Sequence, residues 1–476
     1  MSKRFSRKFL IILNLLFSFH AIHAQVYKED WNSLDKRKTP EWFDEAKLGI
    51  FIHWGVYSVP SWAQALPGPP EWGNTIYYAE WYWRLLQGEP DGSKPGVGFF
   101  PQHHAKMYGD NFKYQDFANQ FKAENFDPNK WADIIHSSGA KYAVLTSKHH
   151  EGFALWPSQY SWNWNSVSIG PHRDLVKDVS EAIRKKGLKM GYYYSLYEWY
   201  NPTYHSNFNR YVNEYMVPQM KELVESYEPD LIWSDGEWDH KSKEWKSEKF
   251  LAWLFNESKV KDKVVVNDRW GSDTRSAHGG YYTTEYGLLD GKEKPTDATI
   301  FHKWEECRGI GRSFGYNRNE NLEDYLSSSQ LLNMFVDIVS KGGNLLLNIG
   351  PTADGRIPVI MQQRLKDLGD WLKVNGEAIY GTKRTEAALA SYNGKNNIYL
   401  TRKGKTLYAI ATAWNENSIA IPVENKNNKI KVTLLGSSSE VKFETKEGKL
   451  NIFFPSLLNN SLQLRTPFVF RIENFE

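Results

Sequence analysis

The sequence predicts an α/β fold in which a (β/α)8-like barrel is followed by a C-terminal antiparallel β-sandwich. From about residue 40 to residue 380, short apolar segments alternate with helix-like segments. Nearly continuous apolar strands are typical of parallel sheets with helices on their outer side. Alternation over this length favours a barrel, with an open doubly wound sheet as the alternative. After about residue 382 the pattern changes to short strands of alternating hydrophobicity, which predicts the sandwich.

Six segments of the first part have the composition of buried strands, and three stretches are typical of helices. We expect strands over residues 47–55, 140–150, 188–195, 229–236, 263–268 and 343–351, and helices over 128–138, 173–186 and 211–227. The glycine-rich run 309–315 has the wrong spacing for a dinucleotide-binding loop and follows no clear strand. No nucleotide cofactor is therefore expected.

The C-terminal part has the pattern of a small all-β domain. Its strands are expected over residues 397–403, 406–412, 418–423, 429–436, 441–445, 450–455 and 462–473. The expected domains are a signal peptide over 1–24, a catalytic domain over 25–382 and the sandwich over 383–476. The plain interpretation of the sandwich is a domain that packs against the barrel, and sugar binding by it is the alternative.

The first 24 residues have the pattern of a signal peptide. Four basic residues precede an apolar run over residues 9–19, and Ala24 offers a small residue for cleavage. That run is too short to cross a bilayer, and no comparable stretch follows, so we expect no membrane span. The single cysteine, Cys307, permits no internal disulfide and is interpreted as a small buried residue. Export without disulfides favours a bacterial protein, periplasmic or secreted.

The composition points away from nucleic acid and towards carbohydrate. The formal net charge is +3 and 24% of the residues are charged, so nucleic acid and anionic membranes are not expected as main partners. Aromatic residues make up 15% of the chain, with 20 Trp and 27 Tyr. Most of these rings are core, but aromatic faces also stack on sugar rings and their polar edges bind hydroxyls. The oligomeric state is left open, a homo-oligomer included.

Polar residues follow four of the predicted strands, at the end where barrel enzymes have their active sites. The first strand ends in His53 and the second in His149 and His150. The fourth ends in Asp235 and the fifth in Arg269. One strand-end histidine is usually structural, but four strands that bring polar residues to the same rim predict a functional site.

Two chemistries could use these residues. The three histidines could bind a metal ion, but their spacing fits no compact metal motif. Glycoside cleavage instead needs two carboxyl groups, donors for the sugar hydroxyls and an apolar wall. A non-catalytic sugar-binding protein would lack one of the two carboxylates. The sequence favours the glycoside hydrolase, without a metal or other cofactor.

Asp235 is the expected nucleophile, because it lies where an apolar strand meets Gly236 and its carboxylate is presented at the rim. A turn-forming aspartate is the ordinary alternative, and Glu237 is the nearest competitor. The expected general acid is Glu285, because the aromatic segment 280–287 around it would raise the pKa of its carboxyl by desolvation. The other acidic residues considered for this role are Glu80, Glu305 and Glu306.

The residues also match a known family. The chain resembles the α-L-fucosidases of glycoside hydrolase family twenty-nine from near Trp31 to its C-terminus. The matching stretches are residues 42–55, 78–82, 146–153, 233–235, 266–271, 302–305, 313–318 and 342–351. Several such stretches in one order over most of the chain make the resemblance highly specific.

The resemblance implies an exo-acting enzyme that releases terminal α-L-fucose with retention of configuration, through a covalent fucosyl-enzyme and without a metal. Asp235 matches the nucleophile, and Glu285 aligns with the acid/base of bacterial members. The two carboxyls of a retaining enzyme lie about 5–5.5 Å apart. The implied substrate is a fucosylated oligosaccharide or a glycoprotein glycan. The resemblance assigns the fucose hydroxyls to His53, His149, His150 and Arg269, and the walls of the pocket to Tyr78, Glu80, Trp81 and Trp233.

Overall fold

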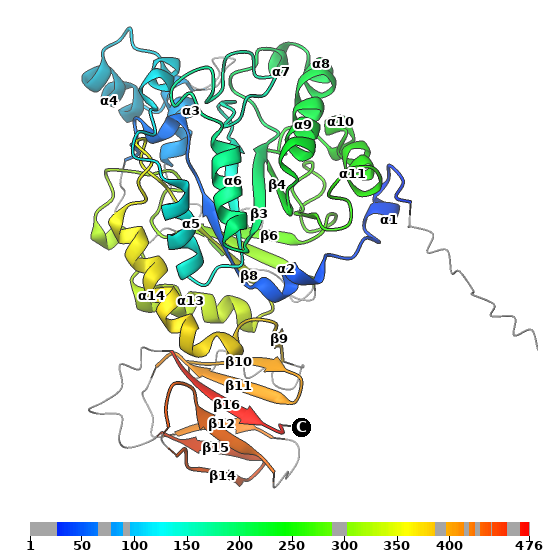
Figure 1. Ribbon diagram of the computed structural model, residues 1–476, viewed down its shortest axis with the longest axis vertical. Helices are drawn as coiled ribbons and strands as arrows, with labels where there is room; N and C mark the ends of the chain where they lie inside the picture. The colour runs from blue at the N-terminus through cyan, green and yellow to red at the C-terminus, as the bar shows by residue number, and fades with distance from the viewer. Residues whose placement is uncertain are drawn as a thin grey trace, which may run out of the picture.

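The computed structural model contains a barrel-like domain and a smaller β-domain that lies below it in Figure 1. It describes residues 26–64, 78–88, 96–287, 302–385, 397–413, 418–423, 429–438, 440–454 and 467–475. The predicted signal peptide, residues 1–24, lies outside the described residues.

The barrel-like domain is built on one curled sheet of eight parallel strands, which confirms the predicted fold class. The strands are β1 (Leu48–Ile52), β2 (Tyr142–Lys148), β3 (Lys189–Ser195), β4 (Leu231–Asp235), β5 (Val265–Val266), β6 (Tyr282–Glu285), β7 (Trp304–Gly309) and β8 (Asn344–Ile349). Their order in the sheet is β5-β4-β3-β2-β1-β8-β7-β6. Among the described residues, side-chain hydrogen bonds rather than strand pairing join the two ends of the sheet, at the β5–β6 seam.

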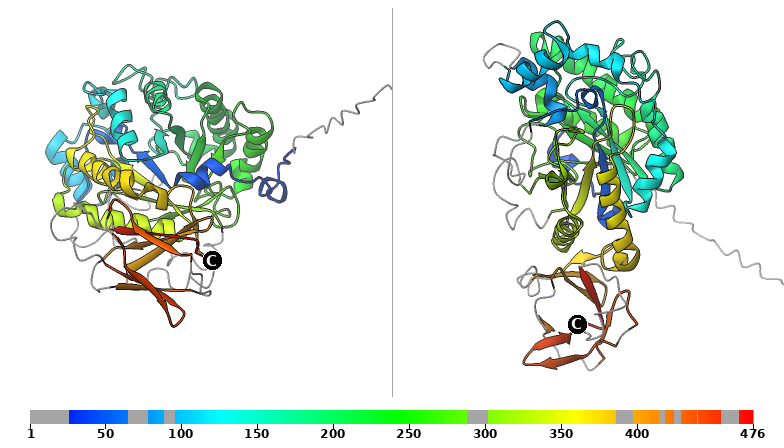
Figure 2. Two further views of the ribbon diagram at one scale, coloured as in Figure 1. Left: turned by 60° about the horizontal axis from the view of Figure 1, so that its bottom comes forward. Right: turned by 90° about the vertical axis from the view of Figure 1, so that its left-hand side faces the viewer.

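Helices cover the outer side of the sheet (Figures 1 and 2). The longer ones are α4 (Phe99–Tyr108), α5 (Pro128–Ser137), α6 (Leu175–Lys185), α9 (Val217–Tyr227), α11 (Ser247–Asn256), α13 (Ser328–Ser340) and α14 (Val359–Asn375). The short ones are α1 (Trp31–Leu34), α2 (Glu41–Ala46), α3 (Tyr82–Gln87), α7 (Thr203–Ser206), α8 (Phe208–Arg210) and α10 (Ser242–Trp245). A π-helical turn over Tyr211–Met216 leads into α9.

Local sequence explains where these helices begin. The Asp127 side chain accepts hydrogen bonds from two backbone N–H groups in the first turn of α5, and Pro128 occupies the first helical position. The Asp174 side chain caps α6 with one such bond, from the backbone N–H of Lys177. The apolar face of each helix packs on the sheet, and burial of such faces at about 25 cal/mol per Å² is the main stabilising term.

Strands β6 and β7 were not predicted, because their sequences are polar. The inward-facing Glu305 of β7 accepts hydrogen bonds from Tyr142 and from Trp233 Nε1, the latter at 3.0 Å. On β6 the inward-facing Thr283 bonds Asp268. Polar side chains with buried partners occupy positions that are apolar in the other strands, so the expected apolar run is missing.

The C-terminal part forms two antiparallel sheets. Their strands are β9 (Lys383–Arg384), β10 (Ile398–Lys403), β11 (Thr406–Ala411), β12 (Ser418–Pro422), β13 (Lys431–Leu434), β14 (Phe443–Lys446), β15 (Lys449–Phe453) and β16 (Phe468–Glu473), in the orders β13-β16-β11-β10-β9 and β12-β15-β14. The inner faces share a core that includes Leu400, Leu450 and Phe470. This part docks on the end of α14, where Trp371 Nε1 donates to the carbonyl of Pro467 at 2.7 Å.

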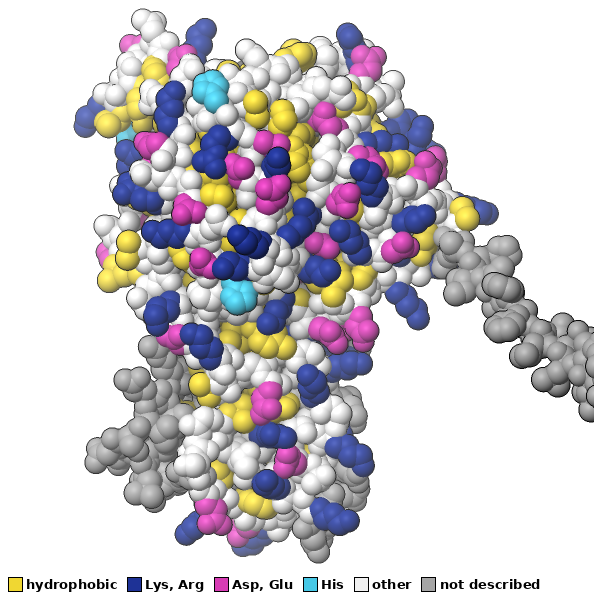
Figure 3. Space-filling view, in the orientation of Figure 1, with side chains coloured by type: hydrophobic (Ala, Val, Ile, Leu, Met, Phe, Trp, Pro, Cys, Tyr) yellow, Lys and Arg dark blue, Asp and Glu magenta, His cyan; other side chains and the backbone are white. Residues whose placement is uncertain are grey.

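The face of the molecule seen in Figure 3 carries Lys and Arg side chains mixed with Asp and Glu, without a continuous patch of one sign. Within the described part of the chain, none of the helices combines the length and the apolar composition needed to cross a membrane.

Candidate active site

All ten predicted site residues line a single pocket at the carboxyl ends of the parallel strands. The space between its lining residues amounts to about 480 Å³, part of which is open to solvent. The ten are His53, Tyr78, Glu80, Trp81, His149, His150, Trp233, Asp235, Arg269 and Glu285. The fold therefore brings together side chains from six separate stretches of the sequence.

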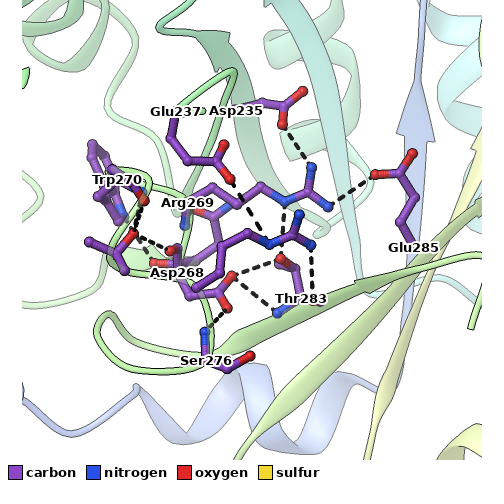
Figure 4. A network of polar contacts seen from close by, with 12 residues as sticks. Asp235, Glu237, Asp268, Arg269, Trp270, Ser276, Thr283 and Glu285 are labelled. Atoms are coloured by element: carbon purple, nitrogen blue, oxygen red, sulfur yellow. Dashed lines mark hydrogen bonds and ion pairs between the residues drawn. The ribbon is translucent and has the colours of Figure 1, made fainter. Parts of the chain in front are cut away.

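Arg269 lies at the centre of the polar network (Figure 4). Its Nη1 donates to Asp235 Oδ1 at 2.7 Å, and its Nη2 donates to Glu285 Oε2 at 3.1 Å. Its Nε donates to Thr283 Oγ1 at 3.0 Å, and the guanidinium carbon lies 4.4 Å from the centre of the Trp233 ring. A planar guanidinium can hold two carboxylates at fixed positions in this way.

Asp268, which sequence reasoning missed, positions the Arg269 side chain through Thr283. Its Oδ1 accepts hydrogen bonds from the Thr283 hydroxyl at 2.7 Å and from the Thr283 backbone N–H at 3.1 Å. Its Oδ2 accepts from the backbone N–H of Ser276 at 3.0 Å. These bonds tie the loop after β5 to β6 across the seam that strand pairing does not close.

Asp235 is the last residue of β4, and its carboxylate is ionised. Tyr193 donates to Oδ2 at 2.9 Å and Arg269 donates to Oδ1. Burial alone would raise the pKa of Asp235, but the charge of Arg269, the nearby His150 and the hydrogen bonds from Arg269 and Tyr193 together outweigh it and lower the pKa to about 2. Gly236 turns the chain sharply after Asp235, with φ 76°, and a side chain there would meet Tyr197.

Glu285 is the last residue of β6 and has the opposite electrostatic environment. Burial raises the pKa of its carboxyl, the nearby charge of Asp235 raises it further, and Arg269 only partly opposes both. Two carboxyl groups whose pKa values are driven apart are suited to the separate roles of nucleophile and proton donor.

The histidines His53 and His150 are held in one tautomer by buried partners. Asn348 Nδ2 donates to the carbonyl of Phe314 at 2.6 Å, so Asn348 Oδ1 faces His53 Nδ1. It accepts a hydrogen bond from that nitrogen at 2.7 Å. The Ser195 hydroxyl donates to the carbonyl of Tyr197 at 2.6 Å, so His150 Nδ1 donates to Ser195 Oγ at 2.5 Å.

The remaining nitrogen, Nε2, of each of these two rings is therefore an acceptor while the ring is neutral. Burial lowers the pKa of both imidazoles well below the usual value, which keeps them neutral. His150 Nε2 lies 3.8 Å from Asp235 Oδ2. A sugar hydroxyl could donate a hydrogen bond to either Nε2.

His149 and His150 both reach the pocket because β2 ends at Lys148, after a register shift against β3. Residues beyond a strand end are freed from its alternation between the two faces. Lys148 itself turns away and forms a buried ion pair with Glu198, 2.8 Å from Nζ to Oε2. His149 Nδ1 lies 3.4 Å from Glu151 Oε2, and burial lowers the pKa of His149 to about 3.

The segment before α3 supplies a further wall of the pocket. Glu80 Oε2 accepts hydrogen bonds from the Gly315 N–H at 2.8 Å and from Ser313 Oγ at 3.1 Å. Burial raises the pKa of Glu80 to about 7. The buried hydroxyl of Tyr78 has no hydrogen-bond partner among the described residues, so it can bind a ligand directly.

Three of the acidic residues considered as alternatives do not line the pocket. Glu305 is engaged by Tyr142 and Trp233, and Glu306 accepts from Thr284 and from the Gly287 N–H at 2.8 Å. The Glu237 carboxyl lies 4.0 Å from Arg275 Nε. Glu80 does line the pocket.

Sequence reasoning missed five lining residues: Phe51, Tyr193, Trp238, Cys307 and Phe314. Their only sequence signal was proximity to strand ends, since aromatic residues are frequent throughout the chain. Cys307 is buried as expected, and burial raises the pKa of its thiol well above the usual value. In the described ranges, no group of three or more His, Cys, Asp or Glu side chains is arranged to hold a metal ion.

Comparison with known proteins gives consistent matches over both parts of the chain. Residues 15–377 match the family model described as alpha-L-fucosidase, and residues 393–473 match that of the alpha-L-fucosidase C-terminal domain. The human tissue alpha-L-fucosidase is 44% identical over 442 residues, which cover 90% of this chain and 88% of that protein.

Two solved structures from Thermotoga maritima are similar throughout. An alpha-L-fucosynthase in complex with a fucosyl disaccharide azide has a TM-score of 0.77, and an alpha-fucosidase in complex with a mechanism-based inhibitor has 0.75. Both are 38% identical to this chain, and each match covers 94% of this chain and 100% of the other.

Proposed function

The chain belongs to the α-L-fucosidase family, glycoside hydrolase family twenty-nine, and we propose that it releases terminal α-L-fucose from glycans with retention of configuration. The observation that carries this proposal is the pairing of Asp235 and Glu285 on one guanidinium, inside a pocket lined by three histidines and by aromatic rings. The substrate is a fucosylated oligosaccharide or glycoprotein glycan, cleaved from its end.

In the first step Asp235 attacks the anomeric carbon while Glu285 transfers its proton to the leaving glycosidic oxygen. The C–O bond to the leaving sugar breaks, and an ester bond between fucose and Asp235 forms. Arg269 supports the attack because it keeps the Asp235 carboxylate ionised and correctly oriented.

In the second step water hydrolyses the ester, and Glu285 takes the proton from that water. The change of role follows from charge. In the free enzyme the negative charge of Asp235 helps to raise the pKa of Glu285. Esterification removes that charge while Arg269 keeps its own, so the pKa of Glu285 falls and the carboxylate becomes available as a base.

The walls of the pocket suit a deoxyhexose. His53, His149, His150 and the free hydroxyl of Tyr78 bind the sugar hydroxyls, and Trp81 and Trp233 limit the space around the ring. Phe51 and Phe314 offer an apolar contact for the methyl group of fucose. A hydroxyl group in place of one hydrogen of this methyl group would be buried there without a hydrogen-bond partner.

We also propose that the chain is exported through its N-terminal signal, residues 1–24. The human tissue alpha-L-fucosidase is a eukaryotic protein, so its similarity gives no support to a bacterial periplasm.

The direct test is release of the chromophore from an aryl α-L-fucoside. The wild-type protein is expected to turn over, and the NMR spectrum of the first-formed fucose is expected to contain the α-anomer. Asp235→Ala should lower turnover by at least about 10³-fold without changing the circular dichroism spectrum. A first-formed β-anomer, or an Asp235→Ala variant with wild-type turnover, would refute the mechanism.

A further inference from the structure

Trp162 is an exposed tryptophan at a backbone position that favours glycine. It lies in the loop after β2, its side chain is 59% exposed, and its φ is 51°. The Trp164 N–H donates to the Ser161 carbonyl at 2.8 Å, which makes Trp162 the second residue of a tight turn. A positive φ is a genuine outlier for a bulky residue. Among the described residues, Trp162 is the only exposed large hydrophobic side chain with a positive φ.

The turn is firmly held, so the exposed ring has a defined position. The Ser161 hydroxyl donates to the Ser158 carbonyl at 2.9 Å. Asn165 Nδ2 donates to Ser161 Oγ at 3.1 Å and to the Trp162 carbonyl at 3.2 Å. Trp164 is buried, and its Nε1 donates to the Glu151 carbonyl at 2.9 Å. Strained conformations that persist in such a framework are often found where a side chain has a function.

Aromatic side chains connect Trp162 to the pocket. The centre of its ring lies 6.3 Å from that of Tyr200, which stacks on Trp164 at 4.7 Å. Tyr200 follows Trp199 in the chain, and the Trp199 ring lies 5.4 Å from that of His150, a pocket residue. The loops after β2 and β3 both emerge at the carboxyl ends of the strands. The buried Trp83 ring lies 6.4 Å from both the Trp199 and the Tyr200 rings, so a chain of aromatic contacts runs from the pocket to Trp162.

We propose that Trp162 is a binding platform for the glycan on the leaving-group side, at least one sugar beyond the residue from which fucose is released. This inference rests on the proposed function. The C–H face of a sugar ring can stack on the exposed indole, and the half-buried Tyr200 extends the same surface towards the pocket. An aryl fucoside fills only the pocket and the position next to it, so it would not reach Trp162.

The strained backbone supplies an unusually clean variant. Trp162→Gly removes the platform and also relieves the strained φ, so the folded protein should be no less stable than wild type. A loss of function in this variant cannot then be ascribed to unfolding. Trp162→Phe keeps an aromatic face and should retain most of the effect of the ring. Phe443→Ala, which removes an aromatic side chain 38% exposed on β14, is the matched control.

The experiment compares kcat/KM for an aryl α-L-fucoside with kcat/KM for a fucosylated oligosaccharide of about five sugars. For Trp162→Gly we expect an unchanged value on the aryl fucoside and a value about 3- to 10-fold lower on the oligosaccharide. The melting temperature should be equal to or above that of wild type. Phe443→Ala should change neither rate.

The other outcomes are separable. Equal rates of Trp162→Gly and wild type on the oligosaccharide would overturn the inference while leaving the proposed function intact. Equal losses on both substrates would also overturn it, because the ring would then act on catalysis. A shift in sedimentation with unchanged kinetics would assign the surface to a second copy of the chain. Failure of the wild type on both substrates would refute the proposed function instead.

Discussion

Asp235 and Glu285 accept hydrogen bonds from the two terminal nitrogens of the same guanidinium, that of Arg269. Each carboxyl group therefore lies in the electrostatic field of the other. The charge of Asp235 raises the pKa of Glu285, while the charge of Arg269 acts to lower the pKa of both. The first two predictions follow from this shared contact.

Arg269→Lys is expected to move the whole pH profile of kcat/KM to higher pH. Asp235 must be ionised, so activity is lost as the pH falls through its pKa, about 2 in the wild type. Glu285 must be protonated, so activity is lost as the pH rises through its raised pKa. Lysine lacks the fork that contacts both carboxyls, so both pKa values should rise.

Activity at the optimum should also fall, by about 10²- to 10³-fold, because the nucleophile loses its orientation. Arg275→Lys is the control, since Arg275 lies in the same region but does not line the pocket. An unmoved profile in Arg269→Lys would contradict the assigned roles.

Glu285→Gln should separate substrates by their leaving groups. A natural glycoside needs its leaving oxygen protonated, so its turnover should fall by about 10²- to 10⁴-fold. An activated aryl fucoside needs little proton transfer and should lose much less. Glu306→Gln, on the neighbouring strand but outside the pocket, is the control and should behave like wild type. Equal losses on both substrates in Glu285→Gln would point to Glu80 as the acid.

Ser195→Ala should impair binding through His150. Without the Ser195 oxygen, His150 Nδ1 loses its acceptor and the ring can place its proton on Nε2 instead. We expect about a 10-fold lower kcat/KM, corresponding to one lost hydrogen bond of about 1.4 kcal/mol. Ser147→Ala removes a buried hydroxyl of β2 that bonds only the Tyr193 carbonyl, so it tests for a mere packing effect. Equal losses in the two variants would refute control of the tautomer by Ser195.

Lys148→Met should destabilise the protein strongly, by about 3–5 kcal/mol in the free energy of unfolding. It leaves the buried Glu198 without its partner, and an unpaired buried charge is costly. The double variant with Glu198→Leu should recover most of that loss, because both charges are then absent. Urea unfolding of the three proteins measures this. A double variant no more stable than Lys148→Met would contradict this explanation, because the loss of stability would then not come from the unpaired charge of Glu198.

A metal chelator should leave the rate on an aryl α-L-fucoside unchanged. The proposed mechanism uses two carboxyl groups and assigns the three histidines to sugar hydroxyls. Activity that disappears with chelation and returns with added zinc would instead support a metal-dependent hydrolase.

Strands β1 to β5 and β8 were predictable because their side chains are apolar on both faces. The same contrast between apolar strand and polar end located His53, Asp235 and Arg269. Strands β6 and β7 escaped prediction because Thr283 and Glu305 face inward and find polar partners in the folded protein.

The partners of the pocket residues could not be predicted either. Asn348 and Ser195 acquire their roles only because β8 and β3 lie beside the strands that carry His53 and the loop of His150. Their function depends on pairing between segments far apart in the sequence, and a pattern along a single chain does not encode that pairing. The exposed Trp162 likewise gives no signal in sequence, since its backbone angle is a property of the folded loop.

The seam between β5 and β6 has a consequence for how this enzyme would lose activity on heating. Among the described residues, Asp268 and Arg269 close it through Thr283, without strand pairing. Gly280 lets the chain pass close beside Val266 at the same place. Parting of the two strands would therefore separate Arg269 from Thr283 and Glu285 and dismantle the catalytic centre. A sugar that occupies the pocket would stabilise the contact between the two strands. Hydrogen exchange of the backbone amides of β5 and β6 would therefore slow in its presence.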